Sequence, residues 1–234
     1  MTRRLKQLQN DILDFFFPRH CVGCGRVEDF ICMDCSRKLS RILPPLCQRC
    51  GKPEASNTLC PTCWGKHDGI DAIRSVFVFQ GVIRNAIYEL KYNYLTSIAG
   101  FLAGHMAEFY KEFKLEGDVM ISVPLHEKRL RYRGYNHAEK LAREVSGLVG
   151  LPVNNYNFKR IKDAPPQART HSVHERVENV KDAFSCEPEV LQDMSIILVD
   201  DVCTSGSTLE ACAVALKSAG ARRVTGFTLA REIS

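Results

Sequence analysis

The stretch IILVDDVCTSGST, residues 196–208, decides the fold of this chain. Its first four residues are apolar and typical of a buried strand, and two acids, Asp200 and Asp201, follow directly. Small hydroxyl residues and one glycine come next, and residues 208–219 have the pattern of a helix. A strand, a short turn and a helix in this order predict an α/β unit, with the turn at the carboxyl end of the strand.

The turn consists of Thr204, Ser205, Gly206, Ser207 and Thr208. Its main-chain N–H groups can converge at a helix N-terminus, where the helix dipole favours an anion such as a phosphate monoester. The hydroxyl groups add hydrogen-bond donors, and the glycine allows a close approach of the ligand. An ordinary helix-capping turn is the alternative interpretation.

Asp200 and Asp201 precede this turn and, when ionised, only accept hydrogen bonds. Carboxylates therefore suit hydroxyl groups or a hydrated Mg²⁺ rather than the phosphate itself. A sugar phosphate with free hydroxyl groups satisfies both the acids and the turn. We predict such a ligand here, with the two acids as the catalytic residues.

A second unit of the same kind begins with VMISV, residues 119–123, which is another apolar strand. The loop after it contains four cations, which are Lys128, Arg129, Arg131 and Arg133. Clustered cations at the end of a strand suit a pyrophosphate group, although the same residues also fit a solvated basic loop. Because the chain also contains the acidic motif, we favour pyrophosphate binding, with Lys128, Arg129 and Arg133 as the residues that bind it.

The chain from residue 68 onward alternates between short apolar strands and helices. Predicted strands cover residues 75–79, 119–123, 195–199 and 224–229, and predicted helices cover residues 83–90, 98–113, 136–148 and 208–219. This alternation predicts an α/β fold with a mostly parallel sheet flanked by helices. Residues 160–180 are polar and contain two consecutive prolines, so we expect a long mobile loop there.

Cysteines cluster in a smaller module that precedes this domain. Eight of the eleven cysteines form four CxxC pairs, at Cys21 and Cys24, Cys32 and Cys35, Cys47 and Cys50, and Cys60 and Cys63. Each pair can aim two sulfurs at one ion, so two pairs complete a tetrahedral site, and eight thiolates predict two structural Zn²⁺ ions. Sequential pairing of the CxxC motifs is the simplest arrangement, and a cross-braced arrangement stays open.

These patterns divide the chain into three predicted parts. Residues 1–20 form an amphipathic helix, residues 21–66 a double zinc ribbon, and residues 68–234 the α/β domain, which includes the long loop at about residues 160–180. The chain has no apolar run of about 18 residues, so we expect no membrane span. Clustered thiols without an export signal favour metal binding in a reducing compartment, and we expect a cytoplasmic protein.

The net charge counts against strong, non-specific binding of nucleic acid. Residues 1–66 contain 11 Lys and Arg against 6 Asp and Glu, whereas residues 67–234 contain 21 of each. Two zinc ions held by eight thiolates would remove most of the excess positive charge from the first part. Phe15, Phe16, Phe17 and Trp64 could stack on bases, but we expect them to pack in the core.

The stretch at residues 196–208 resembles the phosphoribosyl pyrophosphate (PRPP) motif of type I phosphoribosyltransferases. The resemblance implies that Asp200 and Asp201 bind the ribose hydroxyls and that residues 204–208 bind the 5-phosphate. It also implies Mg²⁺, bound together with PRPP.

The whole chain resembles the ComF family, on its Cys-rich N-terminal module, its RGYN at residues 133–136 and a series of later residues. That series is Arg160, Gln167, Arg176, Asn179 and the pair at residues 183–184. In related transferases this region is a flap that closes over the substrate, which implies the same role for Arg160, Gln167 and Arg176. His137 stands where the family often has Gln, and Lys91 lies in a stretch similar to a family LKY sequence, although we expect Lys91 to pack.

The resemblance implies a Mg²⁺-dependent transferase of nucleotide metabolism that displaces pyrophosphate from PRPP. It also implies an association with natural competence, and with single-stranded DNA or DNA-processing proteins as partners. The alternative is a non-catalytic zinc-ribbon module that binds DNA or a protein and uses PRPP as a regulatory ligand.

Overall fold

A computed structural model of the chain describes residues 19–56, 58–65, 69–155, 158–163 and 182–233. Three predictions therefore lie outside the described residues, either wholly or for the most part. They are the amphipathic helix of residues 1–20, the core packing of Phe15, Phe16 and Phe17, and the flap residues Gln167 and Arg176.

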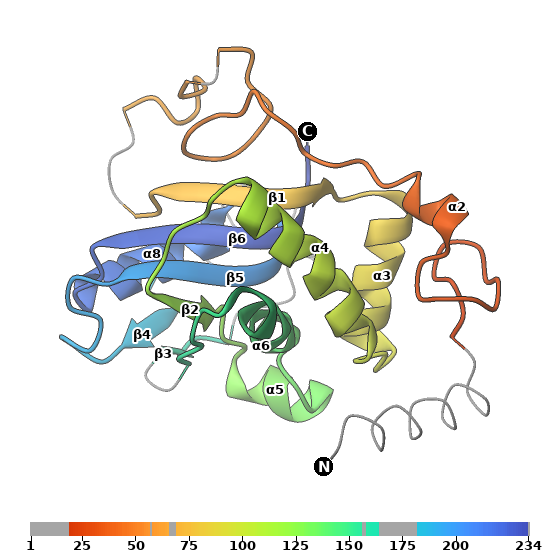
Figure 1. Ribbon diagram of the computed structural model, residues 1–234. Coiled ribbons are helices and arrows are strands. Elements are labelled where there is room, and N and C mark those ends of the chain that lie inside the picture. The colour runs from red at the N-terminus through yellow and green to blue at the C-terminus, as the bar shows by residue number, and fades with distance from the viewer. Residues whose placement is uncertain (1–18, 57, 66–68, 156–157, 164–181, 234) are drawn as a thin grey trace.

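The centre of the molecule is a parallel sheet with the strand order β1-β6-β5-β2 (Figure 1). Its strands are β1 (Ala72–Val78), β6 (Arg223–Arg231), β5 (Ser195–Cys203) and β2 (Val119–Ser122). All four are mostly buried because helices cover both faces of the sheet, as is usual for parallel sheets. The predicted α/β class is confirmed.

Side chains that alternate along β5 separate two apolar layers. Ile197 and Val199 belong to the layer with α3 (Gly81–Tyr92), α4 (Ile98–Glu112) and α6 (His137–Val149). Ile196 and Leu198 belong to the layer with α8 (Ser207–Ser218). Beside α8 lies a small antiparallel pair, β3 (Phe158–Arg160) and β4 (Phe184–Cys186). Because successive side chains of a strand point to opposite faces of the sheet, β5 packs against helices on both faces.

At the candidate site, the structure differs from the sequence-based expectation in two places. Strand β5 continues through the two acids to Cys203, because it stays paired with β6 as far as Arg231. The basic segment expected to be a loop forms a short helix, α5 (Glu127–Arg133). The His126 side chain accepts a hydrogen bond from the Lys128 N–H at its start, and Gly134, with φ of 76°, ends it.

The Cys-rich module lies along the edge of the sheet formed by β1 (Figure 1). The segment before the second CxxC group pairs with β1, because the Ile42 N–H donates to Val76 O at 2.9 Å and the Val78 N–H donates to Ser40 O at 2.8 Å. This pairing covers an edge that would otherwise expose unpaired main-chain groups. The first CxxC group includes the short helix α2 (Met33–Ser36) and lies against α3, where the Asn85 side chain donates to Val22 O.

Among the described residues, no helix is both long enough and apolar enough to cross a bilayer.

Candidate functional site

The eight predicted ligand cysteines form two separate groups of four. Cys21, Cys24, Cys32 and Cys35 form one group, and Cys47, Cys50, Cys60 and Cys63 form the other, with the sulfur atoms of each group within 4.8 Å of one another. None of them is in a disulfide. The structure thus groups the CxxC motifs sequentially.

Both groups fit a four-thiolate zinc centre. The Sγ atoms of Cys24 and Cys32 lie 3.6 Å apart, and those of Cys50 and Cys60 lie 3.7 Å apart. A tetrahedron with Zn–S bonds of about 2.3 Å has edges of about 3.8 Å, so these spacings suit Zn²⁺. Four thiolates complete the coordination of such an ion, and the centres are therefore structural.

The predicted phosphate turn lies between the end of β5 and the start of α8. Gly206, at the N-cap of α8, has φ of 84°, a backbone conformation that favours glycine. Within the described part of the chain, the N–H groups of Thr204, Ser205 and Gly206 make no hydrogen bond to the protein. Three unshared N–H groups at a helix N-terminus are what an anionic group requires.

Asp201 lies next to this turn and is held from two sides. Its side chain is buried, and Oδ2 lies 2.5 Å from Lys91 Nζ and 3.5 Å from His137 Nε2. Oδ1 accepts a hydrogen bond from the Val202 N–H at 2.7 Å. Lys91 belongs to the last turn of α3 and His137 to the first turn of α6, so two helices fix the carboxylate of one strand.

The proton positions in this cluster follow from its contacts. Arg133 Nη1 lies 2.8 Å from His137 Nδ1, and since an arginine only donates, Nδ1 is the acceptor. Burial lowers the pKa of His137, which favours the neutral ring, and its proton then lies on Nε2 and faces Asp201. Burial disfavours the charge of Asp201, but Lys91 and then His137 outweigh it, and its pKa falls well below the usual range.

Asp200 behaves differently from its neighbour. Burial, followed by the nearby charge of Asp201, raises the pKa of Asp200 to about 8. Its Oδ1 accepts a hydrogen bond from the Asp201 N–H at 2.9 Å. One carboxylate oxygen from each acid and one ring nitrogen of His137 lie within 4.8 Å of one another. At neutral pH the pair therefore carries one firmly ionised carboxylate and one that readily takes a proton.

The predicted pyrophosphate-binding residues lie on α5 beside this cluster, and they differ in their contacts. Arg133 contacts His137 and also lies over the ring of Tyr92. Lys128 Nζ lies 3.5 Å from an oxygen of Asp163. The structure thus connects Arg133 to the acids through His137, whereas Lys128 pairs with a different carboxylate.

Arg160, the described member of the predicted flap, lies in β3. Its guanidinium group lies over the Phe184 ring, and Nε donates to Lys162 O at 3.2 Å. Burial and then the nearby charge of Arg129 lower the pKa of Arg160, which indicates that these two cations lie near each other.

Two residues of this cluster were underestimated from the sequence. Lys91 was expected to pack, but its ammonium group pairs with Asp201. His137 was noted only for its position in the family pattern, although the RGYN before it already placed it at the start of a helix near the site. Cys203, the last residue of β5, packs in the core, because it is 2% exposed, and burial raises its pKa to about 11.

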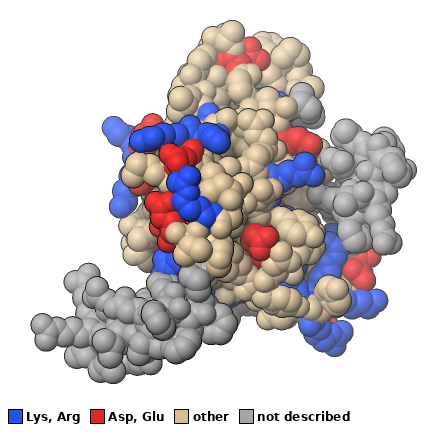
Figure 2. Space-filling model, turned by 90° about the vertical axis from the view of Figure 1, so that its right-hand side faces the viewer, with Lys and Arg blue, Asp and Glu red and all other residues tan. Residues whose placement is uncertain are grey.

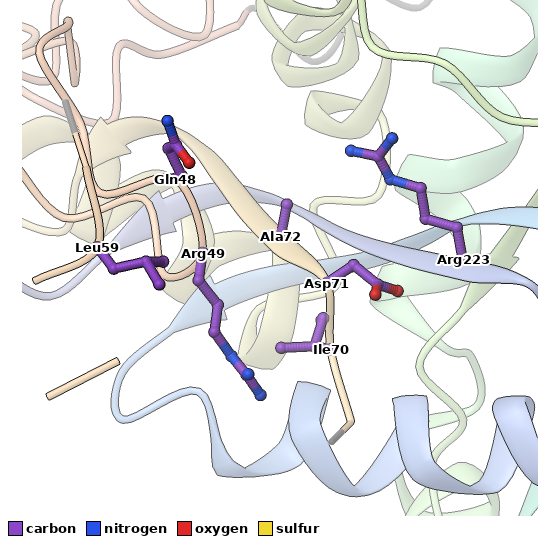
Figure 3. A pocket seen from close by; sticks show the side chains of 7 residues that line it. All are labelled: Gln48, Arg49, Leu59, Ile70, Asp71, Ala72 and Arg223. Carbon is purple, nitrogen blue, oxygen red and sulfur yellow. The ribbon is translucent and has the colours of Figure 1, made fainter. Parts of the chain in front are cut away.

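A cavity of about 340 Å³ lies elsewhere, between the second cysteine group and the first residues of β1 and β6 (Figure 3). It is lined by Gln48, Arg49, Leu59, Ile70, Asp71, Ala72 and Arg223. Ala72 and Arg223 begin their strands, so this cavity lies at the opposite end of the sheet from the phosphate turn. It is not part of the candidate site.

Comparisons with known proteins agree with a Cys-rich module followed by an α/β domain. Residues 12–67 match the double zinc ribbon domain, and residues 130–234 match the phosphoribosyl transferase domain. The DNA utilization protein YhgH of Shigella flexneri is 30% identical over 209 residues, which cover 87% of this chain and 91% of that protein. The chain belongs to the ComF family.

Another ComF relative, the competence protein ComFC of Bacillus subtilis, is 26% identical over 88% of this chain and 85% of its own length. Among solved structures, the glutamine PRPP amidotransferase of B. subtilis, complexed with ADP and GMP, is similar at 20% identity, with a TM-score of 0.39. That similarity covers 57% of this chain and 26% of the amidotransferase chain.

Proposed function

We propose that this ComF protein binds PRPP together with Mg²⁺ at the carboxyl end of β5 and transfers its phosphoribosyl group. The observation that carries the proposal is the set of unshared N–H groups at Thr204, Ser205 and Gly206, which follow the two clustered acids by a few residues at the end of β5. The N–H groups suit the 5-phosphate, and the acids suit the ribose hydroxyls. The match to the phosphoribosyl transferase domain supports the same ligand.

Asp200 is the acid that we assign to the ribose, because it is only half-buried, whereas Asp201 is held by the protein. Asp201 then orients the site, because Lys91 holds its Oδ2 and the Val202 N–H holds its Oδ1. We assign Lys128, Arg129 and Arg133 to the pyrophosphate, and Mg²⁺ would neutralise part of its charge. The C–O bond between the anomeric carbon and pyrophosphate breaks as an acceptor nucleophile bonds to that carbon, and positioning and charge stabilisation drive the step.

Isothermal titration of the zinc-loaded chain with Mg²⁺ and PRPP tests the binding. We expect binding by the wild type above about pH 8, where Asp200 is ionised, and binding weakened at least about tenfold in Asp200→Asn, because a lost charge-assisted hydrogen bond costs about 1.5–3 kcal/mol. Absence of binding by the wild type would overturn the proposal. Release of pyrophosphate, measured across bases, amines and oligonucleotides, tests transfer and identifies the acceptor class.

A second candidate function follows from Trp64 in the second cysteine group. The sequence-based expectation of core packing was wrong for this residue, because its side chain is 76% exposed. An exposed tryptophan beside a zinc knuckle suits stacking on an unpaired base or docking of a partner protein. The names of the relatives, a competence protein and a DNA utilization protein, favour single-stranded DNA.

The charges of the first cysteine group limit this second function. On the face shown in Figure 2, basic side chains lie beside acidic ones. Arg26 pairs with Asp34 at 3.0 Å, and Arg37 lies 3.7 Å from the same carboxylate. We therefore assign DNA contact to the second group. In this alternative the protein is not a catalyst, and PRPP is a regulatory ligand.

Fluorescence titration with a single-stranded oligonucleotide tests this function. Trp64→Ala should weaken binding, whereas Met33→Ala, an exposed apolar residue of the first group, should not. Equal affinity of Trp64→Ala and Met33→Ala for the oligonucleotide would overturn this second function. Since clustered thiolates persist in reducing compartments, we propose that either function operates in the cytoplasm, in the use of DNA taken up by the cell.

A further inference from the structure

Two arginines of the sheet bind the second cysteine group. Arg231, the last residue of β6, is 2% exposed, and its Nη1 donates a hydrogen bond to Cys50 O. Arg74 in β1 donates from Nη2 to Gln48 O at 3.1 Å and from Nη1 to Ile73 O at 2.8 Å. Two guanidinium groups thus bind carbonyl oxygens of one CxxC knuckle.

Neither cation has an acidic partner. Over the described ranges, no Asp or Glu oxygen pairs with Arg231 or Arg74, and the buried Nε of Arg231 has no hydrogen-bond partner. A buried charge without a counter-charge strongly destabilises a fold. Within the part of the chain that the structure describes, no carboxylate therefore compensates Arg231.

The second cysteine group can supply that counter-charge. Four thiolates around one Zn²⁺ carry a net charge of roughly −2, which two guanidinium groups match. The first group provides a contrast, because Arg26 beside it is exposed and already paired with Asp34. Among the described residues, only the second group contacts arginines that have no acidic partner.

The same contacts connect the second group to both ends of the phosphate turn. Arg231 pairs in register with Cys203, the residue before the turn, and the Glu232 N–H donates to Cys203 O at 3.0 Å. Arg49, within the second CxxC knuckle, reaches α8, where its Nη2 lies 3.0 Å from Glu210 Oε1. The knuckle therefore contacts the strand before the turn and the helix after it.

We propose that Arg231 and Arg74 are the counter-ions of the second zinc centre, and that this centre positions the phosphate turn through Arg231 and Arg49. The first half concerns zinc alone, whereas the second half rests on the proposed binding of PRPP. Loss of a group that contacts the ligands of a metal typically lowers metal affinity by about 10–100-fold. Gly51 allows the knuckle to lie close against β1, because an added Cβ would clash with Ile73 O.

Release of zinc from the full chain to a chromogenic chelator tests the first half. In Arg231→Met, one of the two zinc ions should leave about tenfold faster than in the wild type, while the other leaves at its wild-type rate. Arg231→Lys should restore part of the difference because it restores the charge. Arg26→Met is the matched control and should leave the release of the second ion unchanged. Wild-type rates for both ions in Arg231→Met would overturn the proposal.

Arg74→Met keeps the proposal testable if Arg231→Met does not fold, because Arg74 is less buried. It should also speed the release of one ion, and unchanged release would overturn its role. Titration of Arg49→Met with Mg²⁺ and PRPP tests the coupling, and we expect weaker binding with both zinc ions retained. Wild-type affinity in Arg49→Met would overturn the coupling alone, whereas absence of binding by the wild type would remove the proposed function and leave the zinc result standing.

Discussion

Lys91 Nζ lies 2.5 Å from Asp201 Oδ2, and this ion pair joins the last turn of α3 to the carboxyl end of β5. The carboxylate is almost fully buried, and the lysine side chain is 23% exposed. His137 approaches the same oxygen from α6. Asp201 is thus fixed by groups from two helices, so its ionisation depends on the tertiary structure.

Replacement of Lys91 by Met should destabilise the fold, because it leaves a buried carboxylate without its cation. The expected loss is about 3 kcal/mol in the free energy of unfolding, measured by urea denaturation. Lys91→Arg should lose much less because it keeps the charge. Lys111→Met, an exposed lysine of α4, is the matched control. Equal midpoints for Lys91→Met and the wild type would contradict the role of the pair.

Replacement of Asp200 by Asn should change how stability depends on pH. The pKa of Asp200 is raised from its usual value to about 8, so the folded state binds a proton more tightly than the unfolded state does. Its contribution to stability is therefore present below about pH 4 and is lost as the pH rises toward 8.

Asp200→Asn removes that loss, so the variant should gain stability relative to the wild type as the pH increases, by at least about 1 kcal/mol between pH 5 and pH 8. Thermal unfolding at both pH values measures the difference. The same shift in melting temperature at pH 5 and pH 8 would show that Asp200 has an ordinary pKa.

Replacement of Gly206 by Ala should distort the phosphate turn. The residue has φ of 84°, and an added Cβ would lie 3.3 Å from Ile73 Cδ1. We expect a loss of about 1 kcal/mol in stability and weaker binding of Mg²⁺ with PRPP. Gly104→Ala is the control, because this glycine of α4 has open space around it and should gain about 0.5–1 kcal/mol. Unchanged PRPP affinity in Gly206→Ala would argue against the turn as the phosphate site.

Replacement of Arg133 by Met should weaken pyrophosphate binding and also release the His137 ring, since Nδ1 loses its donor at 2.8 Å. Arg131→Met is the matched control, because Arg131 makes a surface pair with Glu127 at 3.2 Å on the same helix. Titration with Mg²⁺ and pyrophosphate should show a loss of about tenfold or more for Arg133→Met and little change for Arg131→Met. Equal losses would indicate a general effect of positive charge on α5.

Local patterns were sufficient for much of the architecture. The apolar residues before Asp200 predicted a buried strand, and the small residues after Asp201 predicted a turn into a helix, because both features depend on neighbours in the chain. The CxxC spacing likewise predicted two four-cysteine groups, since each pair can direct both sulfurs to one point. The basic segment was less predictable, because the capping contact of His126 that starts α5 has no strong sequence pattern.

The sequence by itself determined the α/β class, the two cysteine groups and the position of the phosphate turn, because periodicity and short spacings are properties of adjacent residues. Only the tertiary structure decided which acid is buried and which is accessible, because Lys91 and His137 reach Asp201 from helices that are distant along the chain. It also decided that Arg231 lies against the second cysteine group, because strand pairing and the folding of the ribbon bring the end of β6 to Cys50.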